Sequence, residues 1–338
     1  MRTLLLAAGL ATATTIATTA AQAAPLAGGP VLFRDDMTTA ANWSLVRSPT
    51  GGRIPTDSAA TFDYDYSADG VPEAPNSQPG DAATAGVKLE ANHSGAPPIN
   101  ENLLRLYPVG QSFTGGYVFR FDAWLNYDAV ERNEGGRVGT TERVGGGVGY
   151  APNTNTVLGA HARATGDGDG FPDWQVWNPD PVPGPEFAAG SRQGDAPYYA
   201  MFLPGVPPPA AQNQIGQNPP QLGVAGSPGF QWITWEFRVD LDRTVSIAIE
   251  KPDGSRLPLY SFMADDRPLA SPTDGPIVLE YFDFSNSVAA RPDLTFGLVD
   301  NVVVTRIPEP GAASLAALAL TGLIRRMGDA HPSPQKRG

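Results

Sequence analysis

The sequence predicts an all-β fold, a sandwich of antiparallel sheets joined by long loops. Short stretches alternate apolar and polar residues with a period of two, as strands with one buried face do. Glycine and proline supply 38 and 34 of the 338 residues, which favours many turns. The body between the two chain ends shows no apolar spacing of an amphipathic helix. Many short strands separated by turns are typical of a β-sandwich.

The first half of the chain contains six predicted strands. The clearest is Tyr117–Leu125, in which odd-numbered residues from Tyr117 onward form an apolar face and Arg120 and Asp122 lie on the opposite face. The stretch 49–86 is dense in proline, glycine, aspartate and serine, so it is predicted to be loop around one short strand. The other five predicted strands are Val31–Asp36, Trp43–Val46, Thr61–Tyr66, Gly86–Ala91 and Leu103–Tyr107.

The second half contains the most regular alternation. In Trp232–Leu241, odd-numbered residues from Ile233 to Leu241 are predicted to be buried, while Thr234 and Glu236 are predicted to be exposed. A turn then leads into Thr244–Glu250, and Pro252 with Gly254 predicts a second turn. The remaining predicted strands are Ile277–Phe284, Leu294–Val299 and Asn301–Arg306. The Pro/Gln/Asn-rich loop 203–221 suggests no function.

Residues 1–23 have the pattern of a secretory signal peptide. Arg2 gives a positive start, Leu4–Ala20 is uncharged, and Ala21–Ala23 has the small-x-small form of a cleavage site. The sequence therefore predicts an exported protein whose body spans residues 24–306.

The C-terminal part begins with Pro308, Glu309 and Pro310. The uncharged Gly311–Ile324 is rich in the helix formers alanine and leucine, and Arg325 and Arg326 follow it. A helix of that length reaches about 21 Å, short of a bilayer core of roughly 30 Å, so it is a marginal membrane anchor.

This arrangement resembles the PEP-CTERM sorting signal of exported bacterial proteins. The resemblance covers residues 307–326 and implies recognition by an exosortase, transient membrane anchoring, and delivery to the cell surface or outside the cell. Twelve residues, 327–338, follow the arginine pair and depart from the pattern; they are expected to be a disordered tail. A plain C-terminal anchor or an ordinary surface helix is the alternative.

The body resembles the extracellular domains that precede such signals in planctomycete-type bacteria. The resemblance rests on short motifs: Phe121–Trp124, Gly139–Glu142, Phe282–Ser287 and Leu294–Val304. Those domains are similar to concanavalin-like, laminin-G-type jelly rolls. The resemblance implies a fold and a cell-surface location, and it implies no particular activity.

Charge and cysteine content exclude several kinds of function. The formal net charge is −12, which argues against partners such as nucleic acid or an anionic membrane face. The chain has no cysteine, so disulfides and thiolate chemistry are excluded. The signal-peptide pattern makes the general secretion machinery an expected partner, and the resemblance to the sorting signal implies an exosortase. An extracellular polysaccharide is a further expected partner.

The sequence offers little evidence for an enzyme. It lacks the G-x-S-x-G motif, and its histidines are His93, His161 and, in the tail, His331. His93 and His161 are expected to be surface residues. It also lacks the E-x-D arrangement of laminarinase-type hydrolases. Asp122, Glu236 and Glu280 are candidates for a glycosidase pair, but solvation or pairing with Arg120 or Arg238 explains them more simply.

The most specific local pattern is Asp167–Asp173. Asp167, Asp169 and Asp173 stand at i, i+2 and i+6, separated by glycines that let the loop curl, and carboxylates in such a loop suit calcium. The run resembles one turn of a thrombospondin type-three calcium repeat. It occurs once and lacks further ligands, so an ordinary Asp-Gly turn is the stronger interpretation.

Aromatic residues follow this pattern. Trp174 and Trp177 are predicted to lie in a loop, and Tyr198 and Tyr199 in a second Pro/Gly-rich region. Aromatic faces in loops stack on sugar rings, so these four residues are the expected glycan site, if they do not simply cover the edge of the sandwich.

Three functions remain open after these arguments. The leading one is a structural or adhesive surface protein without enzymatic activity. The second is a calcium-assisted carbohydrate-binding module, and the third is a glycan hydrolase or lyase.

Overall fold

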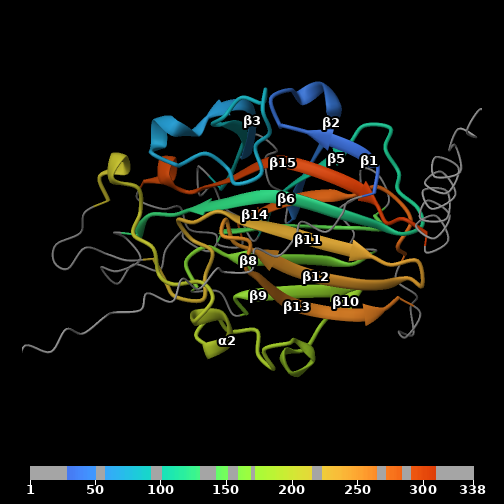
Figure 1. The fold of residues 1–338 in the computed structure, drawn as a ribbon. Helices are drawn as coiled ribbons and strands as arrows, with labels where there is room; N and C mark the ends of the chain where they lie inside the picture. Colours follow the sequence, from blue (N-terminus) through green and yellow to red (C-terminus); the bar gives the residue numbers. More distant parts are fainter. Residues whose placement is uncertain are drawn as a thin grey trace, which may run out of the picture.

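Two antiparallel sheets pack face to face, which confirms the predicted all-β jelly-roll sandwich (Figure 1). The computed structural model describes residues 29–50, 58–92, 101–129, 142–150, 159–168, 172–214, 223–264, 272–283 and 291–309. Within these residues, helical structure is limited to α2 (Pro197–Ala200) and a few single 3₁₀ turns. Almost all positioning of side chains is therefore done by strands.

One sheet has eight strands in the order β13-β12-β11-β6-β15-β4-β3, with β1 also paired to β15. The terminal strands β1 and β15 thus lie side by side in this sheet. The strands are β1 (Val31–Asp35), β3 (Ser58–Asp65), β4 (Ala85–Ala91), β6 (Tyr117–Asn126), β11 (Ile233–Val239), β12 (Thr244–Glu250), β13 (Arg256–Met263) and β15 (Phe296–Arg306).

The other sheet has seven strands in the order β10-β9-β8-β7-β14-β5-β2. Its strands come from widely separated parts of the chain. They are β2 (Trp43–Thr50), β5 (Glu101–Pro108), β7 (Glu142–Gly147), β8 (His161–Thr165), β9 (Trp174–Asn178), β10 (Asp180–Pro181) and β14 (Val278–Asp283).

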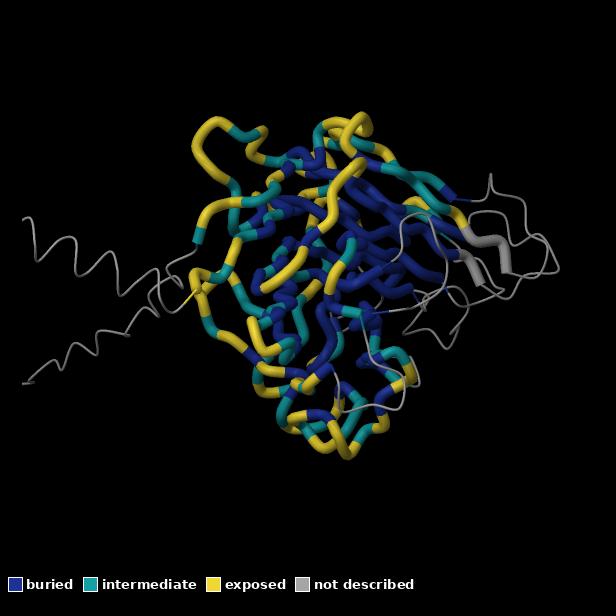
Figure 2. The backbone as a smooth tube through the Cα atoms, turned by 90° about the vertical axis from the view of Figure 1, so that its right-hand side faces the viewer, coloured by how far each residue is buried: buried dark blue, intermediate teal, exposed yellow. Residues whose placement is uncertain are grey.

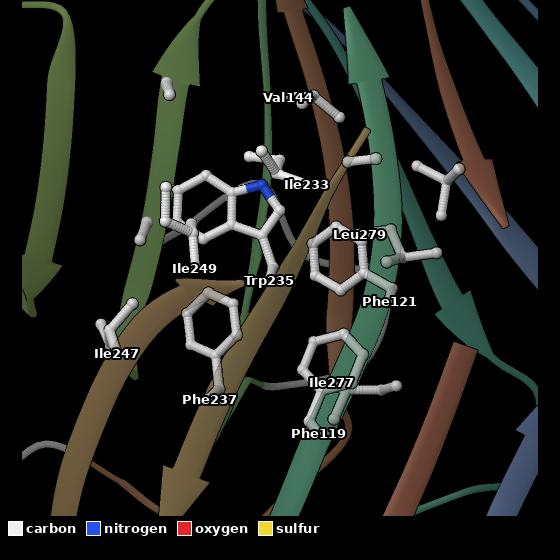
Figure 3. Packing of buried hydrophobic residues seen from close by; sticks show 14 of the residues in the cluster. Phe119, Phe121, Val144, Ile233, Trp235, Phe237, Ile247, Ile249, Ile277 and Leu279 are labelled. Atoms are coloured by element: carbon white, nitrogen blue, oxygen red, sulfur yellow. The ribbon is translucent and has the colours of Figure 1, made fainter. Parts of the chain in front are cut away.

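Aromatic rings from β6 and β11 fill the centre of the core. Phe119 stacks on Phe121 and on Phe237 with ring centroids 5.1 and 5.7 Å apart, and Trp235 packs beside them. Figure 3 shows these rings facing residues of β7 and β14, including Val144 and Leu279, across the sandwich. Each such side chain contributes about 1.5–3 kcal/mol on burial. The alternation read from Tyr117–Leu125 and Trp232–Leu241 is therefore confirmed for these core residues.

The outer face of the eight-stranded sheet is less exposed than the alternation predicts. Figure 2 shows buried backbone through the interior of the body and exposed segments at its periphery. Asp122, Thr234 and Glu236 are buried, and Asn76 from the loop after β3 donates to both Asp122 and Thr234. Trp232 donates from Nε1 to the Pro72 carbonyl at 2.7 Å. Leu241 is exposed because it lies in the turn after β11 and not in the strand. Burial thus follows the covering loop as well as the strand period.

Four substantial strands lie where no strand is predicted: β7, β8, β9 and β13. In β7, glycines occupy three of the six positions, and in β8 the inward residues are Ala162 and Ala164. Such small residues give little apolar signal, so the hydrophobic alternation on which strand prediction rests is weak there.

Several predictions concern the chain ends. The signal peptide, the C-terminal apolar helix, the tail, Pro310, Arg325 and Arg326 lie outside the described residues. Pro308 and Glu309 continue beyond β15 without regular structure. In the part of the chain that the structure describes, no helix has the length and apolarity to cross a membrane.

Candidate functional site

A row of polar residues crosses the outer face of the seven-stranded sheet. Because successive strand residues point to opposite faces, the residues that alternate with the core share the outer face. The pairing register then aligns five neighbouring strands in one row: Gln175, Arg163, Gly145, Glu280 and Arg105. We refer to Arg105, His161, Arg163 and Glu280 as the Glu280 cluster.

Glu280 is the centre of this cluster. Arg105 donates from Nε at 2.8 Å and lies within 2.7 Å through Nη2, so it binds one carboxylate oxygen with both nitrogens. Arg163 donates from Nη1 to the other oxygen at 2.8 Å, and His161 Nε2 lies 3.1 Å from that same oxygen. Glu280, Arg105 and His161 are buried, whereas the Arg163 side chain stays 13% exposed.

Electrostatics fix the protonation states. Burial would raise the pKa of Glu280, but His161, Arg105 and Arg163 outweigh it and hold the pKa well below its usual range. Burial lowers the pKa of His161 despite the neighbouring carboxylate. At neutral pH the cluster therefore holds an ionised glutamate, a neutral histidine and two guanidinium ions, a net charge of about +1.

Aromatic rings surround the cations. The Arg163 guanidinium lies 4.7 Å from the Trp177 ring centroid and 3.9 Å from that of Phe282. Arg105 lies 5.4 Å from the Tyr150 ring, and the His161 ring is next to both Trp177 and Tyr150. Planar cations and flat rings in contact form a mixed polar and apolar surface.

Gly145 leaves space for this arrangement. A Cβ at Gly145 would come within 2.6 Å of the Arg163 Cβ, so any larger residue would push β8 away. Gly145 therefore allows the side chain of Arg163 on β8 to cross β7 and reach Glu280 on β14.

Among the residues that the structure describes, a polar atom of His161 and one of Tyr150, whose rings contact each other, have no hydrogen-bond partner. They are Nδ1 of His161 and the hydroxyl of Tyr150, and both are buried. An ionised carboxylate only accepts hydrogen bonds, so His161 donates from Nε2 to Glu280 and Nδ1 carries a lone pair. Unpartnered buried polar atoms are rare in proteins and suggest a role beyond folding.

The structure places two of the three predicted calcium ligands. Asp167 and Asp173 are both buried, and Asp169 lies outside the described residues. Asp173 accepts a hydrogen bond from the Gly194 amide at 2.6 Å, and burial raises its pKa to about 6. Among the described residues, no group of three or more acidic or histidine side chains is arranged to hold a metal. Calcium at this position stays a prediction.

The predicted aromatic site is divided by the fold. Trp174 and Tyr199 are core residues, 1% and 0% exposed, with ring centroids 5.1 Å apart, so they offer no face to a ligand and that prediction is wrong for them. Trp174 and Trp177 lie on β9 and not in a loop. Because strand residues alternate, Trp177 points to the outer face and joins the Glu280 cluster. Tyr198, half-buried on α2, donates to the Pro258 carbonyl.

The candidate glycosidase carboxylates are divided between the two sheets. Glu280 belongs to one sheet, while Asp122 and Glu236 lie on the other. Arg120 pairs with Glu236 at 3.5 Å, as the pairing explanation predicts, and Arg256 also binds it. His161 is buried, so the expectation that it is a surface residue is wrong; His93 and His331 lie outside the described residues.

Comparisons with known proteins find similarity in structure alone. No protein-family model matches the chain, and no curated protein matches it. The chain is similar to an endo-β-1,4-glucuronan lyase from the fungus Trichoderma reesei, with 9% identity, a TM-score of 0.39, and coverage of 82% of this chain and 96% of that one.

Two lectin-type structures are similar to the same extent. The legume lectin-like domain from Entamoeba histolytica has 8% identity and a TM-score of 0.37, covering 79% of this chain and 91% of that one. The exoplasmic domain of VIP36, in a form bound to Ca²⁺ and Man3GlcNAc, has 6% identity and a TM-score of 0.36, covering 80% and 87%.

Proposed function

We propose that this chain is an exported, adhesive surface protein that binds an acidic glycan on the outer face of its seven-stranded sheet. The observation that carries the proposal is the partly exposed surface formed by Gln175 and Arg163 of this row and by Trp177 beside them, held in place by the contacts of the Glu280 cluster. Sugar-binding sites combine polar groups that hydrogen-bond hydroxyls with flat rings that stack on the sugar. Gln175 and Arg163 provide the polar groups, and Trp177 provides the flat ring.

The charge of the row favours an acidic sugar. Arg163 has a planar guanidinium suited to a carboxylate, and the Glu280 cluster, which includes Arg163, has a net charge of about +1 in a protein whose formal charge is −12. Gln175 accepts from Arg163 at 2.7 Å and donates to the Pro172 carbonyl, so its position is fixed. The ligand-contacting groups are thus oriented before the ligand binds.

Delivery to the cell surface is part of the proposal. The sequence features supporting it are the signal-peptide pattern of residues 1–23 and the sorting-signal pattern of residues 307–326. Removing residues 307–338 should leave the protein secreted but absent from the cell surface, measured by immunoblotting of cell and medium fractions. An unchanged distribution would contradict exosortase sorting.

Binding is tested by isothermal titration calorimetry with polygalacturonate and alginate oligosaccharides as acidic ligands, and with cello-oligosaccharides as neutral ones. Wild-type protein should bind an acidic series more tightly. Trp177→Ala should lose binding by removing the stacking face, and Arg163→Gln should lose the preference for acidic over neutral ligands.

Tyr198→Ala is the matched control, because it removes an aromatic ring of similar exposure on α2, away from the row. It should bind like the wild type. If Tyr198→Ala abolishes binding and Trp177→Ala does not, the glycan site lies at α2 and the proposal for the sheet is wrong. Thermal melting of each variant separates loss of binding from loss of fold.

A second candidate function is glycan cleavage by β-elimination, and the unpartnered atoms of His161 and Tyr150 favour it. Both atoms are buried, so this step requires substrate binding to expose them. The lone pair on His161 Nδ1 then takes the C5 proton of a uronate, a C4=C5 double bond forms, and the C4–O bond breaks. The leaving oxygen takes the Tyr150 hydroxyl proton, and an arginine neutralises the uronate carboxylate. Hydrolysis fits less well, because a glycosidase needs two carboxyl groups and this cluster has one.

The two functions are separated by one assay. Incubation with polyuronates is followed by ultraviolet absorbance of the C4=C5 double bond, which elimination creates and hydrolysis does not. Activity that disappears in His161→Asn while binding persists would establish elimination. No absorbance change with wild-type protein that binds the same ligand would remove the lyase and leave the binding function.

A further inference from the structure

A groove of about 500 Å³ lies on the opposite side of the molecule, on the outer face of the eight-stranded sheet. Its floor is formed by the neighbouring strands β11, β6 and β15 (Figure 1). Its walls are β1, the segment around Asn76 and the residues after β15 up to Pro308. The volume falls within the range of about 300–1,000 Å³ typical of small-molecule sites.

Within the described parts of the chain, two buried acceptor atoms on residues of this groove receive no hydrogen bond. They are Oε2 of Glu236 and Oδ1 of Asn301, on residues that are 1% and 6% exposed. The rest of each side chain is held in place: Glu236 Oε1 accepts from Arg256 at 2.6 Å, and Asn301 donates to Asp122 at 2.9 Å. Oε2 of Glu236 lies 3.5 Å from Arg120 Nη1, which is longer than an ordinary hydrogen bond. Both oxygens therefore keep acceptor capacity for a ligand hydroxyl group.

Guanidinium groups from four strands border the groove: those of Arg34, Arg120, Arg238 and Arg306. The first three are neutralised in part, by Asp81, by Glu250 together with Glu236, and by Asp240. Within the described part of the chain Arg306 makes no ion pair, and it is exposed. One end of the groove therefore offers a free cation to an anionic group.

Together these features define a ligand class. The groove has acceptors for hydroxyl groups on its floor, a free guanidinium at one end, and aliphatic contacts from Val118 and Val303. Its lining contains no aromatic ring, so a ligand would be held by hydrogen bonds and charge and not by stacking. We propose that this groove is a second binding site, for a hydroxylated carboxylate such as a sugar acid of one or two rings.

This site is independent of the proposed glycan site, because the two lie on the outer faces of opposite sheets and share no residue. The test measures thermal shift and calorimetric binding of D-glucuronate to the full chain, with D-glucose and sulfate as controls. Glucuronate should raise the melting temperature by mass action. Glucose and sulfate should each need at least a tenfold higher concentration to produce the same shift. Equal effects of sulfate and glucuronate would overturn the proposal in favour of a general anion effect.

Two variants locate the site. Val303→Trp fills the groove with a large side chain on a half-buried strand position and should abolish glucuronate binding. Arg306→Gln should reduce glucuronate affinity at least tenfold towards that of glucose, whereas Arg291→Gln, at another exposed arginine, should have no effect.

Outcomes that assign binding elsewhere are clear. Glucuronate binding that survives Val303→Trp but disappears in Arg163→Gln would overturn this site and support the one on the seven-stranded sheet. Binding that disappears in Val303→Trp and survives Arg163→Gln would establish the groove, whatever the result for polysaccharides at the other sheet.

Discussion

The outer faces of the two sheets each have a buried carboxylate at their centre, and the two carboxylates are stabilised in opposite ways. Glu280 is surrounded by two arginines and a histidine. Asp122 accepts only from neutral donors: Thr234 at 2.6 Å, Asn76 through its side chain at 2.6 Å, and Asn301 at 2.9 Å. Burial raises the pKa of Asp122 despite these bonds, whereas the cations lower that of Glu280. The neutral donors at Asp122 attach the segment of Asn76 to the sheet, whereas the cations at Glu280 keep a buried carboxylate ionised.

The largest expected effect is at Glu280. Glu280→Ala leaves Arg105 and Arg163 near each other without their counter-charge in a buried site, so it should destabilise the fold by about 3–5 kcal/mol. Urea unfolding measures the loss. The double variant Glu280→Leu with Arg105→Met should recover part of it, because the buried charge is removed with its partner. A cost below about 1 kcal/mol for the single variant would show that the cations are solvated.

The next effect concerns pH and has opposite signs in the two regions. Burial raises the pKa of Asp300, beside Asp122, from 3.8 to about 7. Its protonated form therefore stabilises the fold fully below pH 3.8, and this contribution is lost as the pH rises through about 7. The wild type should lose stability between pH 5 and pH 8, and the Asp300→Asn variant should not. The free energy of unfolding of the variant relative to the wild type should therefore rise by about 2–4 kcal/mol over this range.

Glu280 supplies the contrast. Because its folded pKa is depressed, its contribution is present above its usual pKa of 4.5 and is lost as the pH falls through the folded value. Urea unfolding between pH 3 and pH 8 measures both groups. A wild type and an Asp300→Asn variant with parallel stability curves would show that Asp300 titrates normally.

A smaller effect is expected at Asp122. Asp122→Asn keeps the shape of the side chain and one acceptor oxygen, but its NH₂ group faces the donors of Asn76 or Asn301. The variant should therefore lose about 1–2 kcal/mol of the free energy of unfolding at neutral pH. The cost should shrink at low pH, where the wild-type carboxyl is protonated. A loss as large as that of Glu280→Ala would show that Asp122 is stabilised by charge.

The smallest effect is expected at an exposed pair on the same sheet. Arg238 and Asp240 form an ion pair at 2.7 Å with both side chains about one-third exposed. Arg238→Ala should change the free energy of unfolding by less than about 0.5 kcal/mol. A larger loss in the same urea experiment would mean that Arg238 also supports the neighbouring groove.

The sequence predicts the eight-stranded sheet much better than the seven-stranded one. Phe119, Trp235 and Phe237 alternate with polar residues, so the period of two is visible in β6 and β11. In β7, Val144 is followed by three glycines, and the inward residues of β8 are Ala162 and Ala164, so these strands show little of the apolar alternation. The strands that carry Arg163 and His161 are therefore the ones that alternation misses.

The candidate site needed information that lies outside local sequence. Trp177 was identified as a candidate from its residue type, but its neighbours Arg163 and Glu280 come from two other strands, and Glu280 is more than a hundred residues away. Only the pairing of the strands brings these three residues together on one face of the sheet. The inward or outward direction of Trp174 and Trp177 likewise depends on a strand assignment that the surrounding prolines and aspartates conceal.

The position of β15 has a mechanical consequence. This strand pairs with β6 along most of its length and with β4 and β1 on its other side, and it runs directly to Ile307 and Pro308 (Figure 1). A pull on the C-terminal end would act along β15 and load its interstrand hydrogen bonds in shear, many at once. A pull on the N-terminal end would load only the pairs between β1 and β15, which are fewer than the pairs that hold β15 to β6 and β4. The molecule should therefore withstand a larger force when its C-terminal end is pulled away from the body than when its N-terminal end is.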